Sequence, residues 1–112
     1  MIFYFAKVQD TDGNWWYKTG HTKNMAKRFS DKRMYRDWEC IETRQFAEED
    51  IKGVEQHFKD LQIGKAHKEH NIPPHFMGKT EIIKPEVSRE EVVERMKAIN
   101  VPNKTRLEDF EG

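Results

Sequence analysis

The chain has 112 residues, of which 36% are hydrophobic and 36% charged, with 20 basic and 20 acidic side chains. A chain of this length is expected to form one domain with a modest core, and 7 Phe, 3 Tyr and 3 Trp argue against disorder. The single cysteine, Cys40, excludes an internal disulfide. No apolar run of the sequence is long enough for a membrane span. We therefore expect a protein of the cytoplasm, or of a virus-infected cell, with no membrane partner.

The N-terminal residues predict a β-hairpin. Aromatic and β-branched residues dominate positions 2–8 and 15–19, which is typical of strands. Between them, positions 10–14 contain Asp, Asn and Gly, the residues that favour turns. The two strands are therefore expected to pair antiparallel.

The next two elements are expected to be a helix and a strand. Thr22 or Asn24 can cap a helix that runs to about residue 32, with Met25 and Phe29 on its buried side. Positions 38–46 then alternate between apolar and polar residues, as a half-buried strand does.

The C-terminal half predicts two further helices. Residues 48–62 carry an apolar stripe at helical spacing, made by Ile51, Val54, Phe58 and Leu61. A long loop over 64–78 and a short strand over 79–83 should follow, and Ser88 begins a capping box for a helix to about residue 99. Residues 100–112 are polar.

This order of elements predicts a small α/β (α+β) fold with a three-stranded, mainly antiparallel sheet flanked by helices. We expect residues 1–84 to form the main domain and residues 85–112 to form a C-terminal helix and polar tail.

Positive charge is concentrated in one segment, although the net charge is zero. Residues 21–36 contain six Lys or Arg and one acid. Such a local patch can bind nucleic-acid phosphates even in a neutral protein. The candidate DNA-binding residues, besides Arg28, are Lys23, Lys27, Lys32, Arg33 and Arg36. Arg28, Lys32 and Arg36 would share one flank if the helix continued that far.

The most informative residues surround the second strand. Tyr17, Lys18 and His21 stand close together in the sequence, and Arg28 lies on the helix that follows. A phenol, an amine, an imidazole and a guanidinium in one small area can hold a phosphodiester and deprotonate a water molecule.

These residues resemble the GIY-YIG nuclease family, and more closely its small branch with a Tyr-Lys-Ile-Gly second motif. That motif is represented here by Tyr17-Lys18-Thr19-Gly20, and Arg28 lies eight residues beyond Gly20, the spacing of the family's catalytic arginine. Glu55 lies on the helix after the third strand, where the family carries its metal-binding glutamate. Gly78-Lys79-Thr80-Glu81 resembles the ending of the small branch. The likeness covers about residues 2–83.

The chain also departs from the family pattern. Phe3-Tyr4-Phe5 replaces the first motif, Thr19 replaces an aliphatic residue, and Lys18 replaces the tyrosine of the wider family. These changes leave open which aromatic residue replaces the family tyrosine.

The resemblance implies a GIY-YIG-type endonuclease that hydrolyses DNA phosphodiester bonds with Mg²⁺ or Mn²⁺. Its implied catalytic roles are Tyr4 or Tyr17 as the base, with Lys18 and His21 as tuning and positioning groups. Arg28 would clamp the phosphate. Glu55 would hold the metal, and Glu81 is the alternative ligand.

Plainer interpretations remain open for each of these residues. Tyr4 is then one packed aromatic, and Arg28, Glu55 and His21 are surface groups. The corresponding functions are a non-catalytic, nuclease-like module that binds DNA or protein, and an accessory protein that reuses only the fold. If the chain is a nuclease, either one site cuts one strand or a homodimer cuts both.

Overall fold

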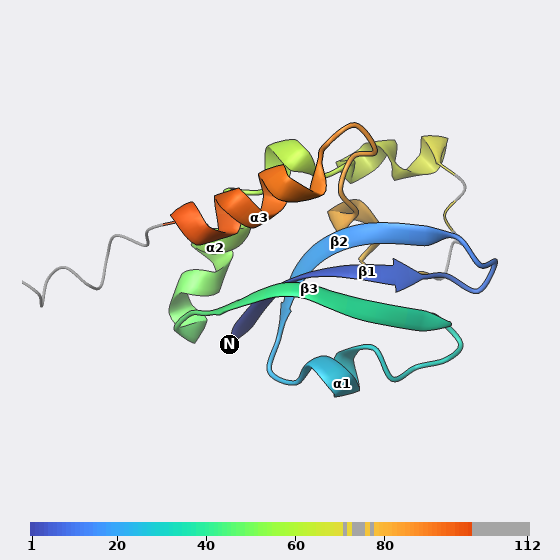
Figure 1. Cartoon of the computed structure of the whole chain (residues 1–112), viewed down its shortest axis with the longest axis horizontal. Helices are drawn as coiled ribbons and strands as arrows, with labels where there is room; N and C mark the ends of the chain where they lie inside the picture. The colour runs from blue at the N-terminus through green and yellow to red at the C-terminus, as the bar shows by residue number, and fades with distance from the viewer. Residues whose placement is uncertain (71, 73–75, 77, 100–112) are drawn as a thin grey trace, which may run out of the picture.

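The computed structural model describes residues 1–70, 72, 76 and 78–99. Its elements include a three-stranded antiparallel sheet in the order β2-β1-β3, which confirms the expected fold class (Figure 1). The strands are β1 (Ile2–Gln9), β2 (Trp15–Thr22) and β3 (Asp37–Gln45). The α-helices are α1 (Met25–Arg28), α2 (Ile51–Gln56) and α3 (Arg89–Ala98). Four 3₁₀ turns are η1 (Glu48–Asp50), η2 (Lys59–Leu61), η3 (Gly64–Glu69) and η4 (Lys79–Glu81).

The predicted hairpin is confirmed, and its second strand is longer than expected. The Asp10 carboxylate organises the turn by accepting hydrogen bonds from the backbone of Asp12 and Asn14 and from the Trp16 indole. Pairing of β2 with β1 continues to Thr22, which lies opposite Ile2. The strand therefore does not end at residue 19 as predicted, because β1 offers backbone partners along the full length of β2.

The first helix is much shorter than predicted. Asn24 caps it, accepting a hydrogen bond from the Lys27 backbone, but the helix ends at Arg28 instead of residue 32. The Ser30 hydroxyl bonds to the Lys27 carbonyl and the Asp31 carboxylate accepts from the Arg33 backbone, so both side chains compete with helix continuation. Lys32 and Arg36 consequently do not share a helix flank with Arg28.

Two predictions in the second half need correction. The helix expected over 48–62 is divided into η1, α2 and η2. The Arg95 guanidinium donates a hydrogen bond to the His57 carbonyl at 2.8 Å, an oxygen that a continuous helix would use for its own backbone hydrogen bonding. The strand expected over 79–83 is instead η4 followed by isolated bridges at Ile82 and Ile83. Gly78, which precedes η4, is in the left-handed region (φ 75°), and its carbonyl accepts a hydrogen bond from the Glu81 backbone at 2.9 Å, so residues 79–81 form a turn and not a strand. The long loop over 64–78 begins with η3, and residues 71, 73–75 and 77 of it lie outside the described residues.

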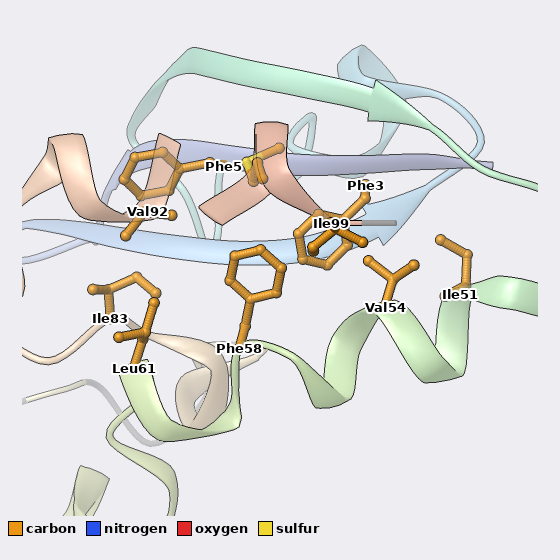
Figure 2. Close-up of a cluster of buried hydrophobic side chains, with 10 residues drawn as sticks. Phe3, Phe5, Ile51, Val54, Phe58, Leu61, Ile83, Val92 and Ile99 are labelled. Carbon is orange, nitrogen blue, oxygen red and sulfur yellow. The ribbon is translucent and has the colours of Figure 1, made fainter. Parts of the chain in front are cut away.

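The helices α2 and α3 cover one face of the sheet. Their apolar side chains meet Phe3 and Phe5 of β1 in a buried group that we name the helix-covered cluster (Figure 2). Its members are Phe3, Phe5, Ile51, Val54, Phe58, Leu61, Ile83, Val92, Met96 and Ile99. Ser88 caps α3 as predicted, by accepting from the Glu91 backbone at 3.1 Å. None of the described helices is long and apolar enough to cross a membrane.

A second buried group occupies the opposite face of the sheet, where α1 lies (Figure 1). We name it the aromatic cluster because rings of Tyr4, Phe29, Tyr35 and Phe76 follow one another with centroids 5.1 to 5.3 Å apart. Its members are Tyr4, Ala6, Val8, Phe29, Tyr35, Ile63, Phe76 and Ile82.

Candidate functional site

Strand β2 lies at the edge of the sheet and divides the predicted site residues between the two faces. Gly20 lies opposite Tyr4 and Lys18 opposite Ala6, so these residues share the face of the aromatic cluster. Tyr17 lies on the other face, where its ring packs 5.6 Å from that of Phe5. Of the two tyrosines considered from the sequence, only Tyr4 therefore lies with Lys18.

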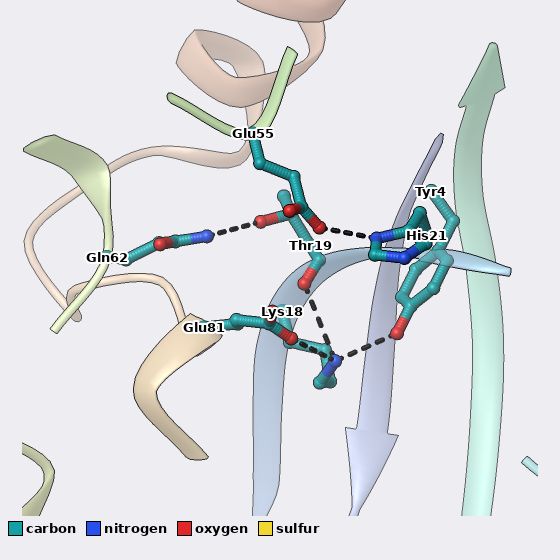
Figure 3. Close-up of polar contacts among 7 residues, drawn as sticks. All are labelled: Tyr4, Lys18, Thr19, His21, Glu55, Gln62 and Glu81. Atoms are coloured by element: carbon teal, nitrogen blue, oxygen red, sulfur yellow. Dashed lines mark hydrogen bonds and ion pairs between the residues drawn. The ribbon is translucent and has the colours of Figure 1, made fainter. Parts of the chain in front are cut away.

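Lys18 is the most unusual side chain of the site, because a lysine amine is ordinarily charged and exposed, whereas this one is 0% exposed. Its Nζ contacts the Tyr4 hydroxyl at 2.8 Å and lies 3.4 Å from both the Thr19 carbonyl and Glu81 Oε1 (Figure 3). Glu81 is half-buried and belongs to η4. The buried amine thus joins β1, β2 and η4 at one point.

Arg28 reaches the same point from α1. Its half-buried guanidinium hydrogen-bonds to the hydroxyl groups of Tyr4 and Tyr35. Among the residues that the structure describes, no carboxylate lies within ion-pair distance of Arg28. We name Tyr4, Lys18, Arg28, Tyr35 and Glu81 the polar cluster.

Burial shifts the two central groups of this cluster in opposite directions. Desolvation raises the pKa of Tyr4 to about 12, although the charge of Arg28 acts to lower it. Desolvation lowers the pKa of Lys18, although the Glu81 carboxylate acts to raise it. Both groups are therefore driven toward their neutral forms.

Two glycines allow these side chains to pack so closely. A Cβ at Gly20 would lie 2.6 Å from Tyr4 Oη, so the phenol crosses β2 only where that strand has no side chain. A Cβ at Gly78 would lie 2.9 Å from Lys18 Nζ, and its positive φ also favours glycine. Both glycines of the predicted motifs therefore serve the packing of the polar cluster.

The opposite side of β2 holds a second group of polar contacts. His21 Nδ1 lies 2.5 Å from Glu55 Oε2, which joins the end of β2 to α2 (Figure 3). The Gln62 amide donates to the Thr19 hydroxyl at 2.9 Å. These contacts place Glu55 next to the edge strand.

A hollow of about 120 Å³ connects the two groups. Glu55 and Glu81, the two alternative metal ligands, both line it. The other lining residues are Phe3, Thr19, Gly20, Lys59, Gln62, Gly64 and Thr80. No set of three His, Cys, Asp or Glu side chains in the described part of the chain is arranged to hold a metal ion.

The predicted DNA-binding residues are spread over the surface. Lys23 lies 3.8 Å from Glu48, and Arg33 pairs with Asp31. Arg36 lies at the β1–β2 turn, where its backbone bonds to Gln9. Lys27 and Lys32 are exposed.

Some members of the site were not predicted from the sequence. Tyr35 follows the short α1 and was overlooked, although it is the third tyrosine and lies seven residues beyond Arg28. Gln62 and Lys59 have no local pattern that marks them as lining a hollow. Only the way η2 and η4 fold against β2 brings them there.

The chain was compared with protein-family models, curated proteins and solved structures. No family model matches it, and no curated protein or solved structure matches it either.

Proposed function

We propose that the protein is a divalent-metal-dependent endonuclease that hydrolyses DNA phosphodiester bonds at the edge of β2. One observation carries the proposal: Arg28, Tyr4, Lys18 and Glu81 form one connected polar cluster beside a hollow that Glu55 also lines. Phosphodiester hydrolysis requires a cation for the phosphate, a proton acceptor and a carboxylate for a metal ion.

Arg28 is the proposed phosphate clamp. Its guanidinium has planar donors that suit phosphate oxygens, and its hydrogen-bond partners are the phenols of Tyr4 and Tyr35, not carboxylates. Burial acts to lower the pKa of Arg28, but the neighbouring Tyr4 and Tyr35 outweigh it and the net shift is upward. The guanidinium therefore stays charged at every pH at which the protein would work.

Glu55 is the proposed metal ligand. Oxygen groups from Glu55, Gln62 and Thr80 line the hollow, and Mg²⁺ or Mn²⁺ favours such oxygen ligands. A single protein carboxylate suits Mg²⁺, which keeps several waters and takes substrate phosphate as a further ligand. The bound metal would neutralise charge on the phosphate. We assign Glu81, which lies 3.4 Å from the Lys18 amine, as the counterion of Lys18 and not as a metal ligand.

Tyr4 is the tyrosine that best fits a part in water activation, as the residue in contact with the Lys18 amine. Its hydroxyl lies behind Gly20, which lines the hollow, whereas Tyr17 belongs to the helix-covered side. His21 holds the Glu55 carboxylate and is proposed to position it. The exposed basic residues Lys27 and Lys32 would add sequence-independent electrostatic attraction for DNA. The proposed location of this activity is the cytoplasm.

One observation favours a second candidate, a nuclease-like module that binds DNA without cutting it. Tyr4 and Lys18 are both 0% exposed, so a water molecule has no direct contact with either. Such a module would keep Arg28 as its phosphate contact and would need no metal.

Incubation of supercoiled plasmid with the purified protein and Mg²⁺ or Mn²⁺ tests the proposal. We expect cleavage, and we expect Arg28→Ala to slow it by roughly 100- to 1,000-fold, as loss of one charge-stabilising donor does. Arg89→Ala is the matched control because Arg89 is exposed at the start of α3. DNA binding without cleavage under either metal would support the second candidate, and no DNA binding at low salt would contradict both.

A further inference from the structure

We propose that Lys18, which shares one proton with Tyr4, is the proton acceptor of the site, and that Glu81 connects it with the hollow. The inference rests on the proposed function and gives the proton of the attacking water a destination. It starts from a buried contact: the Lys18 amine and the Tyr4 hydroxyl lie 2.8 Å apart, and both side chains are closed to solvent.

Charge balance limits how many protons this pair can hold. The groups that face it are Arg28 from α1, Glu81 from η4 and Tyr35 before β3, and the charge of Glu55 on α2 also acts on Tyr4. If Lys18 is an ammonium and Tyr4 a neutral phenol, the polar cluster holds two cations, Lys18 and Arg28, against one carboxylate, Glu81, which lies within ion-pair distance of Lys18 only. Because an unbalanced buried charge is costly, the cluster favours one proton fewer.

Two arrangements satisfy that balance. In the first, the neutral Lys18 amine accepts a hydrogen bond from the Tyr4 hydroxyl, which keeps its proton, and donates to the Thr19 carbonyl and the Glu81 carboxylate. In the second, a Lys18 ammonium donates to a Tyr4 phenolate, which Arg28 also stabilises. They differ by one proton moved across 2.8 Å, so the pair titrates as a unit. The lowered pKa of Lys18 and the raised pKa of Tyr4 favour the first arrangement at rest.

Glu81 supplies the route from solvent to the amine. Its carboxylate lines the hollow and also lies 3.4 Å from Lys18 Nζ. A water O–H bond breaks as its proton binds Glu81, and the proton then passes to the Lys18 lone pair. The hydroxide oxygen bonds to phosphorus while the bond from phosphorus to the leaving oxygen breaks. The leaving oxygen takes a proton back along the same path, which restores the neutral amine.

A bound phosphate should strengthen this acceptor. Its negative charge beside Arg28 would offset the extra positive charge that Lys18 acquires on protonation. The pKa of Lys18 is therefore expected to rise when an anion binds, so the amine accepts a proton most readily once substrate is present.

Carbon-13 NMR of lysine-labelled protein tests the inference without any need for catalysis. The Lys18 signal is the one that disappears in Lys18→Met, and inorganic phosphate serves as the anion. We expect its titration midpoint to lie below 10.5, the ordinary lysine value, and phosphate to raise it by at least about 0.5 pH unit, roughly threefold in proton affinity. Lys52, exposed on α2, is the internal control. A Lys18 midpoint at or above 10.5, or one that phosphate leaves unchanged, would overturn the inference.

The pH dependence of cleavage provides the second readout. Below its midpoint Lys18 is protonated and cannot accept a proton, so kcat/KM should fall at acidic pH. Lys18→Met should lower kcat/KM by roughly 100-fold or more and remove that fall, whereas Tyr4→Phe should move it along the pH axis. An unchanged acid limb in folded Lys18→Met would overturn the inference. A wild-type protein that cuts no DNA would overturn the proposed function, and the NMR titration would still decide the proton sharing.

Discussion

Each face of the sheet carries a buried cluster, but the two clusters are built from different side chains. The helix-covered cluster consists of apolar residues from β1, α2, η2 and α3 and from positions next to these elements and η4. On the other face, the rings of Tyr4 and Tyr35 in the aromatic cluster contact the Lys18 amine and the Arg28 guanidinium. One face therefore excludes water by packing alone, and the other also encloses charge.

This difference indicates what each face contributes. Apolar packing is non-directional and tolerates swaps that conserve volume. The polar cluster depends on single contacts, such as the 2.8 Å contact between Lys18 and Tyr4, and on glycines that leave room for them. A buried lysine costs free energy unless its amine has hydrogen-bond partners, so its presence makes this face the candidate for the functional one.

The largest expected effect on stability lies in the helix-covered cluster. Met96 is 1% exposed in the last turn of α3, and Met96→Ala should lower the free energy of unfolding by about 2–5 kcal/mol. Chemical denaturation measures this loss. DNA cleavage per folded molecule should stay unchanged, and a loss of kcat in the folded fraction would show that the two faces are not separable.

A pair of glycine substitutions probes the polar face. Gly20→Ala should cost about 1–3 kcal/mol, because its methyl group would lie 2.6 Å from the Tyr4 hydroxyl in a packed region. Gly53→Ala in α2 is the matched control. Nothing lies within 4 Å of a Cβ there, so alanine should stabilise the helix by up to about 1 kcal/mol. Equal effects at both sites in denaturation experiments would argue against the close approach at Gly20.

The next prediction is that the stability of the protein depends on pH through Lys18 and Tyr4, which both lie on the polar face. Because the pKa of Lys18 is lowered in the folded protein, the unfolded chain binds more protons up to pH 10.5, and stability should rise with pH toward that value. The slope is at most about 1.4 kcal/mol per pH unit. Above pH 10 the sign reverses, since the raised pKa of Tyr4, about 12, makes the folded protein bind more protons.

Thermal melting at several pH values checks this profile. Lys18→Met should flatten the rising part, whereas Lys52→Met should retain it. A rising slope of wild-type size in Lys18→Met would assign the effect to another group.

The smallest expected effect on stability concerns the N-terminal cap of α3. Ser88→Ala removes the hydroxyl that accepts from the Glu91 backbone, and should cost about 1 kcal/mol. In denaturation experiments, Ser88→Thr and Ser88→Asp should keep the stability of the wild-type protein, since threonine and aspartate can also cap the helix. Failure of Ser88→Thr to behave like wild type would mean that the cap is not the source of the loss.

The sequence predicted the helix-covered side well because periodic apolar residues determine it. Ile51, Val54, Phe58 and Leu61 are all buried as their spacing implied, and Ser88 caps its helix. The three strands were also predicted, apart from the continuation of β2 to Thr22.

The polar side was predicted in part. The motif residues Lys18, Arg28 and Glu81 do meet, but only strand register shows that Tyr4, and not Tyr17, joins them. The early end of α1 depends on local bonds of Ser30 and Asp31 that compete with the helix. Tyr35 enters the site through ring packing that no sequence period encodes.

The most direct test of a single hydrolytic site is a double-mutant cycle on plasmid cleavage rates. Arg28→Ala, Glu55→Gln and the double variant are compared with wild type in Mg²⁺ or Mn²⁺. If both residues serve one transition state, each single change should slow cleavage greatly and the double variant should be little slower than the worse single. Losses that multiply in the double variant, or a wild-type rate equal to that of Arg28→Ala, would contradict the account.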